Sequence, residues 1–169
     1  MSEIETVWQE IENARRGASF FGHVFPMNAG SAPQRIEQYL TKSIGFYIPD
    51  QLAESLLLFD GMDRKRGVWR VGFIPLSVDD IVKTWRKDRQ REREAIDEGD
   101  DVIKQSHHLP VMYDPTLHHE IYMDVRDGSV LNYNISGIYF ESYRFPDYLS
   151  FLSEVSDFRP MDGYMEWPM

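Results

Sequence analysis

The sequence predicts a single α+β domain, built from a mainly antiparallel sheet flanked by helices. Its 169 residues are close to the usual size of one domain, and no linker divides them. Helical patterns are more frequent in the first half of the chain and strand patterns in the second. The strands follow one another through short turns, which join antiparallel rather than parallel strands. Residues 1–169 are therefore predicted to form one domain.

The first helix is predicted over residues 3–15. Apolar residues recur there at helical spacing, and Ser2 suits the N-cap position. Residues 17–31 are rich in glycine and small side chains, so we expect an irregular segment that its aromatic residues anchor to the core. Those aromatic residues are Phe20, Phe21 and Phe25.

Two more helices are predicted before residue 62. One begins at Pro33, which fits the first turn of a helix, and ends near Gly45, which fits a C-terminal cap. Its apolar stripe consists of Ile36, Tyr39 and Leu40. The apolar stripe of the next helix consists of Leu52, Leu56 and Phe59. The Asp-Gly pair after Phe59 is expected to end that helix.

A strand at 68–74, closed by Pro75, is predicted to precede a fourth helix. Ser77 is the expected N-cap of this helix, and the aspartates of its first turn suit the positive end of the helix dipole. The apolar stripe fades after Trp85 into a charged run, so the helix is expected to project into solvent. Residues 97–105 are predicted to form a loop.

The rest of the chain is predicted to contain most of the sheet. The expected strands are 109–113, 120–125, 129–134 and 137–143. Asp127-Gly128 is predicted to be a two-residue hairpin turn. A last helix is expected to open at Pro146. The Met- and aromatic-rich tail at 157–169 either covers an edge of the core or binds a partner.

The formal charge of −10 bears on the partner. An acidic surface repels phosphate backbones and attracts basic proteins, so we expect no direct nucleic-acid binding. Residues 83–93 are an exception, with six basic and two acidic residues, while the remainder holds 12 basic and 26 acidic residues. Acids and bases alternate there at three- and four-residue spacing, which favours a solvated, self-paired helix over a nucleic-acid contact.

The absence of cysteine excludes disulfides, thiol nucleophiles and cysteine-bound metal sites. The first 16 residues have neither the basic start nor the apolar core of a signal peptide. No apolar run approaches the ~20 residues that a membrane span needs. We therefore expect a cytoplasmic protein that makes no membrane contact.

Four stretches together resemble a known family. They are residues 36–61 (IEQYLTKSIGFYIPDQLAESLLLFDG), 74–86 (IPL, then a helix ending in WR), 108–111 (HLPV) and 122–130 (YMD leading to GSV). In their order and spacing the chain resembles the SUKH superfamily, Smi/Knr type, over about residues 36–155. The resemblance implies a SUKH-like α+β fold and a protein-binding role without a cofactor. Bacterial members are commonly immunity proteins, which bind and neutralise the toxin domain of a polymorphic or contact-dependent toxin, often a nuclease.

Polar residues at the start of two strands raise the question of a metal site. They are His107, His108, His118, His119 and Glu120. Adjacent residues on a strand point to opposite faces, so each histidine pair offers one ligand to a shared site. Two histidines and a carboxylate make a poor closed zinc site, so we favour polar turn residues and predict no metal. The sequence contains no G-x-S-x-G motif, phosphate loop or nucleophile–base pairing, and no catalytic residue is assigned.

These features favour a protein that binds a basic partner, a toxin domain if the resemblance holds. The alternatives are a regulatory scaffold of the same fold and a metal-dependent enzyme. We place the binding face where aromatic residues lie beside carboxylates and where 117–120 depart from the family pattern. The residues of this face are Tyr113, Asp114, His118, Glu120, Tyr122 and Asp124. Alternatively, Tyr122 faces the core and Asp124 only holds the hairpin.

Overall fold

The computed structural model describes residues 1–17, 27–62, 74–101, 104–114, 119–134 and 142–157. Its helices are α1 (Glu3–Gly17), η1 (Arg35–Leu40), α2 (Thr41–Ile44), α3 (Asp50–Leu58), α4 (Val78–Glu98) and α5 (Tyr148–Asp157). Its strands are β1 (Met27–Ala29), β2 (Phe59–Met62), β3 (Ile74–Pro75), β4 (His108–Asp114), β5 (His119–Asp124), β6 (Val130–Asn134) and β7 (Ser142–Phe145).

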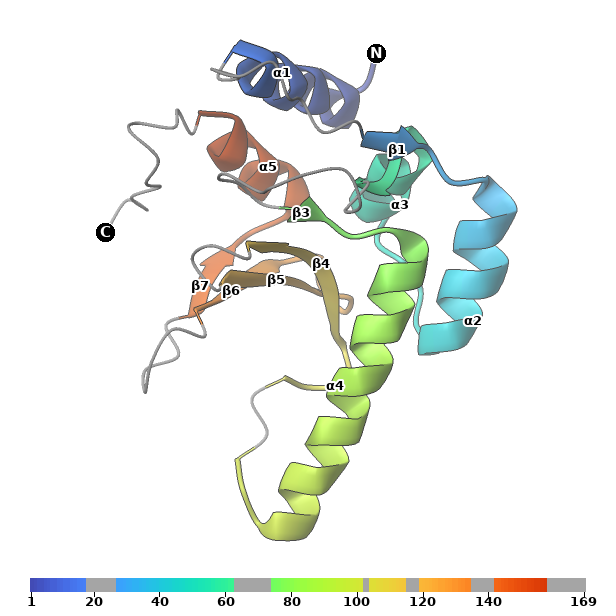
Figure 1. The fold of residues 1–169 in the computed structure, drawn as a ribbon, viewed down its shortest axis with the longest axis vertical. Helices are drawn as coiled ribbons and strands as arrows, with labels where there is room; N and C mark the ends of the chain where they lie inside the picture. Colours follow the sequence, from blue (N-terminus) through green and yellow to red (C-terminus); the bar gives the residue numbers. More distant parts are fainter. Residues whose placement is uncertain (18–26, 63–73, 102–103, 115–118, 135–141, 158–169) are drawn as a thin grey trace.

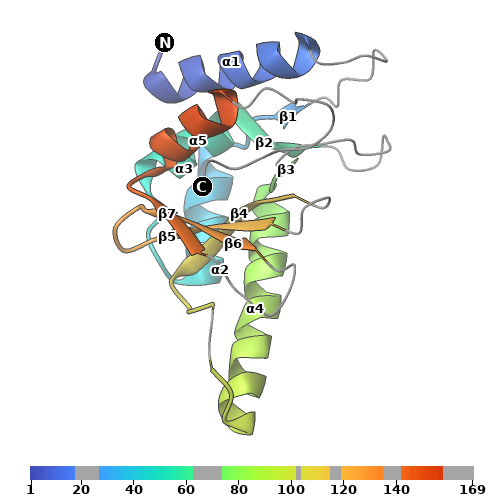
Figure 2. The same ribbon diagram turned by 90° about the vertical axis from the view of Figure 1, so that its left-hand side faces the viewer.

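An antiparallel sheet in the order β3-β4-β5-β6-β7 forms the centre of the fold, and β1 and β2 form a second antiparallel pair. The predicted α+β class and the antiparallel sheet are confirmed. Helices α1 and α5 pack together at one end, whereas α4 runs along the β4 side of the sheet and extends beyond it at the other end (Figures 1 and 2). None of the helices in the described part of the chain is long and apolar enough to cross a membrane.

The two faces of the large sheet are buried in different ways. Ile121 and Met123 belong to the main core, with apolar residues of α1, α3, α4 and α5. Tyr122 lies between them in sequence and points to the opposite face, because side chains alternate along a strand. There it forms a second, smaller cluster with Leu131 and Tyr133. The sheet is therefore covered on both faces around β5.

The N-terminal helix begins as predicted, because the backbone N–H of Glu5 donates to Ser2 Oγ at 3.2 Å. Its buried residues are Ile4, Trp8 and Ile11. The prediction of an irregular segment at 17–31 is wrong at its C-terminal end, where β1 pairs with β2. The phenylalanines of that segment lie outside the described residues.

The helix predicted from Pro33 to Gly45 is present, but its middle is the π-helical η1, in which the Thr41 N–H bonds to the carbonyl of Ile36. Its buried residues Ile36, Leu40 and Ile44 lie four apart. A π-helical turn holds more residues than an α-helical one, so the residue three positions after Ile36 does not reach the buried face. Tyr39 is accordingly 41% exposed, and its predicted place in the apolar stripe is wrong.

Two further boundaries differ from the predictions. Phe59 does not continue α3 but begins β2, where it pairs with Ala29. The predicted strand at 68–74 lies outside the described residues except for its last residue, and β3 includes Pro75. The cap of α4 is confirmed, since the Asp80 N–H donates to Ser77 Oγ at 3.2 Å. Helix α4 continues to Glu98, so the predicted loop begins later than expected.

The hairpin between β5 and β6 is wider than the predicted two-residue turn. The Asp124 N–H bonds to the carbonyl of Ser129, and the Gly128 N–H bonds to the carbonyl of Asp124, both at 2.8 Å, so the loop spans residues 125–128. At the start of α5, Asp147 rather than Pro146 caps the helix, because its Oδ1 accepts from the Ser150 N–H at 2.8 Å. The tail at 158–169 lies outside the described residues.

Candidate functional site

Three residues of the predicted binding face, Glu120, Tyr122 and Asp124, share one face of β5 because they alternate along the strand. Tyr122 and Asp124 are each only 1% exposed, so neither forms part of an exposed contact surface, and their place in the predicted face is corrected. The alternative interpretation agrees better with the burial of these two residues: Tyr122 is a buried residue, and Asp124 holds the hairpin.

The other residues of the predicted face lie toward one end of the β4–β5 pair or outside the described residues. Tyr113 pairs with Glu120, and Asp114 with His119. His118 is outside the described residues. The side chain of His119 contacts Asn132 Oδ1 at 2.9 Å and is buried, away from His107 and His108 at the other end of the strands.

A polar network joins β5 to α4 around the Tyr122 hydroxyl. This oxygen lies 2.8 Å from Asp88 Oδ2 and 3.1 Å from Glu120 Oε2. Lys104 pairs with Glu120, and its Nζ lies 4.9 Å from the centre of the Tyr122 ring. Burial, reinforced by the two carboxylates, raises the pKa of Tyr122 far above its usual value. The hydroxyl therefore stays protonated and serves as a donor between two acids.

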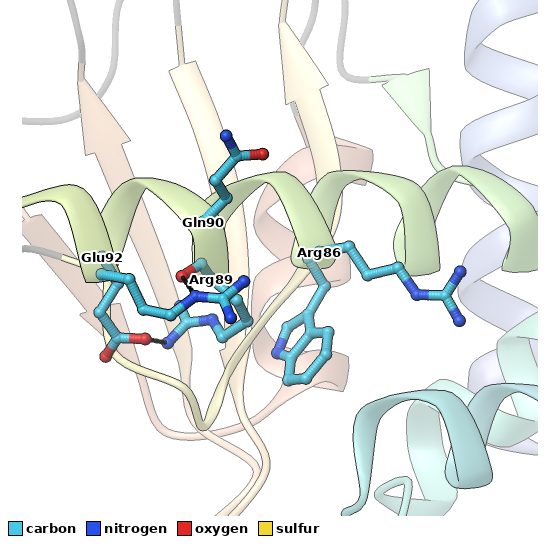
Figure 3. Close-up of a pocket in the computed structure, with 6 residues that line it drawn as sticks. Arg86, Arg89, Gln90 and Glu92 are labelled. Atoms are coloured by element: carbon cyan, nitrogen blue, oxygen red, sulfur yellow. Dashed lines mark hydrogen bonds and ion pairs between the residues drawn. The ribbon is translucent and has the colours of Figure 1, made fainter.

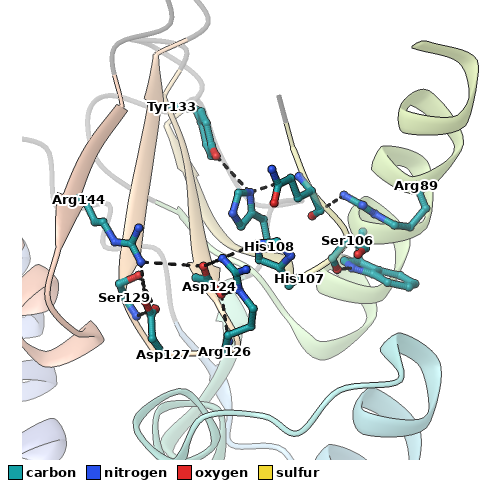
Figure 4. A network of polar contacts seen from close by, with 12 residues as sticks. Arg89, Ser106, His107, His108, Asp124, Arg126, Asp127, Ser129, Tyr133 and Arg144 are labelled. Atoms are coloured by element: carbon teal, nitrogen blue, oxygen red, sulfur yellow. Dashed lines mark hydrogen bonds and ion pairs between the residues drawn. The ribbon is translucent and has the colours of Figure 1, made fainter. Parts of the chain in front are cut away.

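The middle of α4 is fixed to the loop that precedes β4 (Figure 4). Arg89 Nη2 donates to the carbonyls of Lys104 and Gln105, both at 2.8 Å, and Trp85 Nε1 donates to the carbonyl of Ser106 at 3.0 Å. Asp88, one residue before Arg89, is buried against the sheet. The expectation that α4 projects into solvent directly after Trp85 is therefore wrong. The helix stays attached to the sheet for at least one more turn.

His107, His108 and Asp124 place one ligand atom each within 4.8 Å of one another. The prediction that an adjacent histidine pair offers only one ligand is wrong for His107 and His108, because His107 precedes β4 and is not constrained by its pleat. However, the Asp124 carboxylate already accepts two hydrogen bonds from the Arg126 guanidinium. Arg126 Nε lies 3.0 Å from Oδ1, and Nη2 lies 2.7 Å from Oδ2. These bonds lower the pKa of Asp124 to about 2. A cation would have to displace a guanidinium, so we keep the prediction of no metal, which elemental analysis of the purified protein checks.

The imidazole of His108 is buried at the start of β4, between the loop before the strand and Tyr133. The Gln105 N–H donates to its Nδ1 at 3.3 Å, and the Tyr133 hydroxyl lies 3.2 Å from the same atom. Burial, and secondarily the neighbouring His107, lower the pKa of His108 from 6.5 to about 4. The folded protein therefore holds this imidazole neutral in a range where an unfolded chain would protonate it.

This shift predicts a specific loss of stability in acid. Between pH 6.5 and 4 the unfolded state binds a proton at His108 that the folded state does not, so stability falls as the pH falls. The loss is up to about 3 kcal/mol at pH 4. Urea unfolding of the parent and of His108→Gln across this range measures it, because the variant lacks this proton and should lose less. Parallel curves for the two proteins would contradict the assignment.

A shallow groove of about 610 Å³ lies along α4, partly on the side that faces the loop before β4 (Figure 3). Its lining residues are Trp85, Arg86, Arg89, Gln90, Glu92 and Arg93. Arg89 pairs with Glu92, and Gln90 donates to Glu94 at 2.8 Å. Both pairs have the three- and four-residue spacing expected of a self-paired helix. However, the Arg89 and Glu92 side chains are only 11% and 20% exposed, so the prediction of a solvated face is wrong at this pair.

Beyond the groove, α4 ends in an exposed stretch that we call the acidic tip, residues 94–101. It contains no basic residue. Its acids are Glu94, Asp97, Glu98, Asp100 and Asp101, all exposed. Ile96, 60% exposed, lies among them. This surface was not among the predicted binding residues, because the basic run before it dominates the charge pattern and part of the tip has the composition of a loop. The signal was present as a block of acids after the last arginine.

No protein-family model matches this chain, and no curated protein matches it in sequence.

Proposed function

We propose that the protein binds a basic protein partner stoichiometrically, and that this partner is a bacterial toxin domain which it neutralises in the cytoplasm. The identity of the partner rests on the resemblance to SUKH immunity proteins. The observation that carries the binding role is the acidic tip. No catalytic residue is assigned, and the protein is proposed to act by covering its partner.

The acidic tip is unfavourable for the helix that bears it. The C-terminus of a helix carries partial negative charge, so an acid in the last turn costs about 0.3–1 kcal/mol where a base would stabilise. Asp97 and Glu98 occupy the end of α4, and its last turn contains no basic residue. The acids of the tip do not stabilise α4, so the stability of the helix does not explain them. Such negative charge is expected where a protein recognises a basic surface. Such a surface also speeds association and competes with phosphate for a basic nuclease cleft.

Two other functions predict different results. A regulatory scaffold of the same fold would use the acidic tip to bind a cellular protein, and a neighbouring toxin would be irrelevant to it. A metal-dependent enzyme would need an ion at His107, His108 and Asp124, where Arg126 now sits. Charge complementarity favours binding of a basic protein over metal-dependent catalysis, and the resemblance to SUKH immunity proteins favours a toxin over a cellular protein as the partner.

The proposal predicts that a toxin is encoded directly upstream of this gene, and co-expression with the domain of that toxin tests it. The parent is expected to restore growth and to form a one-to-one complex. The triple variant Asp97→Asn, Glu98→Gln, Asp100→Asn is expected to associate about tenfold more slowly at low salt, with a weaker salt dependence. The matched control changes net charge equally at exposed acids elsewhere, through Glu3→Gln, Glu10→Gln and Glu154→Gln.

The outcomes separate the two parts of the proposal. If the parent neither binds nor protects against the neighbouring toxin, the toxin-neutralising function is wrong. If the parent binds but the tip variant and the control associate at the same rate, the function stands and the acidic tip is not the surface that attracts the partner.

A further inference from the structure

We propose that the exposed turn between α2 and α3, centred on Tyr47, is the docking site for an arginine side chain of the basic partner. This inference rests on the proposed function and adds a location and a contact chemistry to it. We call the site the Tyr47 site and define it as Tyr47 with the flanking carboxylates Glu37 and Asp50.

The exposure of Tyr47 is the first observation. Tyr47 is 73% exposed, the highest value among the aromatic residues whose exposure the structure describes. Tyr39, 41% exposed, lies on the preceding helix. Scattered exposed apolar residues are ordinary, but tyrosine is enriched in the energetic centres of protein interfaces because it combines a large apolar ring with a hydroxyl. Tyr47, the more exposed of the two tyrosines, is therefore a candidate contact residue.

The second observation is that the ring is held in place before any partner binds. Gly45, at φ 77°, ends α2, and Ile48 directly after Tyr47 is buried in the main core. The Tyr47 hydroxyl donates to Asp50 Oδ1 at 2.6 Å, across the start of α3. Because the backbone on both sides and the far end of the side chain are fixed, little conformational entropy remains to be lost on binding.

The third observation is the charge around the ring, which selects the partner. The hydrogen bond to Asp50 raises the pKa of Tyr47, and the negative charges of Asp50 and Glu37 add to the rise. Both carboxylates are exposed. A guanidinium over the face of Tyr47 is attracted by the ring and by both acids, whereas a phosphate or an acidic peptide is repelled. A planar guanidinium also stacks on an aromatic ring better than a lysine ammonium does.

The Tyr47 site lies where the acidic tip can assist it. Helix α2 packs against α4, and α4 continues past the end of α2 to the acidic tip (Figure 1). The negative charge of the tip attracts the partner over distance and raises the association rate constant. Tyr47 makes a short-range contact that lowers the dissociation rate constant. The two surfaces therefore predict separable kinetic effects.

If a toxin domain is encoded upstream, as the proposed function predicts, its inactivated form is the probe for binding to Tyr47 variants. Tyr47→Ala is expected to raise Kd about tenfold, mostly through faster dissociation. Tyr47→Phe keeps the ring and is expected to raise Kd no more than about threefold. Leu57→Ala is the matched control, because Leu57 is also an exposed apolar residue, 44% exposed on α3. Equal Kd values for Tyr47→Ala and Leu57→Ala would overturn the Tyr47 site while leaving the proposed function intact.

A second measurement does not depend on the toxin. Hexa-arginine is titrated into the full chain by NMR, with hexalysine in parallel. Localised shifts at residues 46–50, larger for arginine and lost in Tyr47→Ala, support the site, and their absence overturns it. Sedimentation of the free protein tests whether a second copy of the chain occupies the Tyr47 site instead. A dimer that dissociates in the Tyr47→Ala variant would overturn the proposal.

Discussion

Replacing Tyr122 with alanine is expected to lower the free energy of unfolding by about 3–5 kcal/mol, as for other large buried aromatic residues. The ring is fully buried and packs edge-on against Tyr133, with centroids 5.4 Å apart. It also carries the hydroxyl that satisfies Asp88. The substitution therefore opens a cavity and leaves a buried carboxylate without its donor. Urea unfolding at pH 7 measures the change.

The variant Tyr122→Phe separates these two contributions. It keeps the ring and removes only the hydroxyl, so it is expected to cost about 1–3 kcal/mol, the penalty for an unsatisfied buried group. Tyr47→Ala is the matched control for the alanine substitution, since the same atoms are removed from an exposed position and stability should change little. If Tyr122→Ala were as mild as Tyr47→Ala, β5 would not be covered by α4 as described.

Most of the fold could be predicted because its elements follow local rules. The Ser77 cap and the strands around β5 depend on short-range patterns of hydrogen bonding and burial. The errors come from choices that local patterns do not decide. A π-helical η1 turns Tyr39 outward, and pairing with Ala29 draws Phe59 into a strand. Both choices depend on residues distant in sequence or on an unusual hydrogen-bond register.

The candidate site was harder to predict, for a reason that Tyr122 illustrates. Alternation along β5 correctly places Glu120, Tyr122 and Asp124 on one face, but it does not say what covers that face. Asp88 and Lys104 cover it, and they come from a segment predicted to be a solvated helix face and from a predicted loop, respectively. Charged residues are seldom buried unless paired, so composition alone favoured exposure. The pairing partner is visible only in three dimensions.

The contact between β2 and the start of α4 leads to the second large effect. Gly61, at φ 73°, lies so close to this helix that an added Cβ would stand 2.4 Å from the Ser77 nitrogen and 2.9 Å from the Leu76 carbonyl carbon. These are backbone atoms and cannot rotate away. Asp60, beside it, accepts from the Val78 N–H at 2.7 Å, so displacement of β2 would also break a bond at the first turn of α4.

Gly61→Ala is therefore expected to combine two penalties. The left-handed backbone costs a non-glycine residue about 1–2 kcal/mol, and overpacking against a fixed backbone adds about 1–3 kcal/mol. Gly45→Ala is the matched control, because Gly45 has nearly the same φ, 77°, and nothing within 4 Å of an added Cβ. It should show the first penalty alone. Urea unfolding of the two variants checks this, and equal losses would mean that β2 does not approach the Ser77 backbone this closely. A larger loss of unfolding free energy for Gly61→Ala would show that the extra penalty arises where β2 meets the start of α4. This junction positions α4, which carries both the Asp88–Tyr122 contact and the acidic tip.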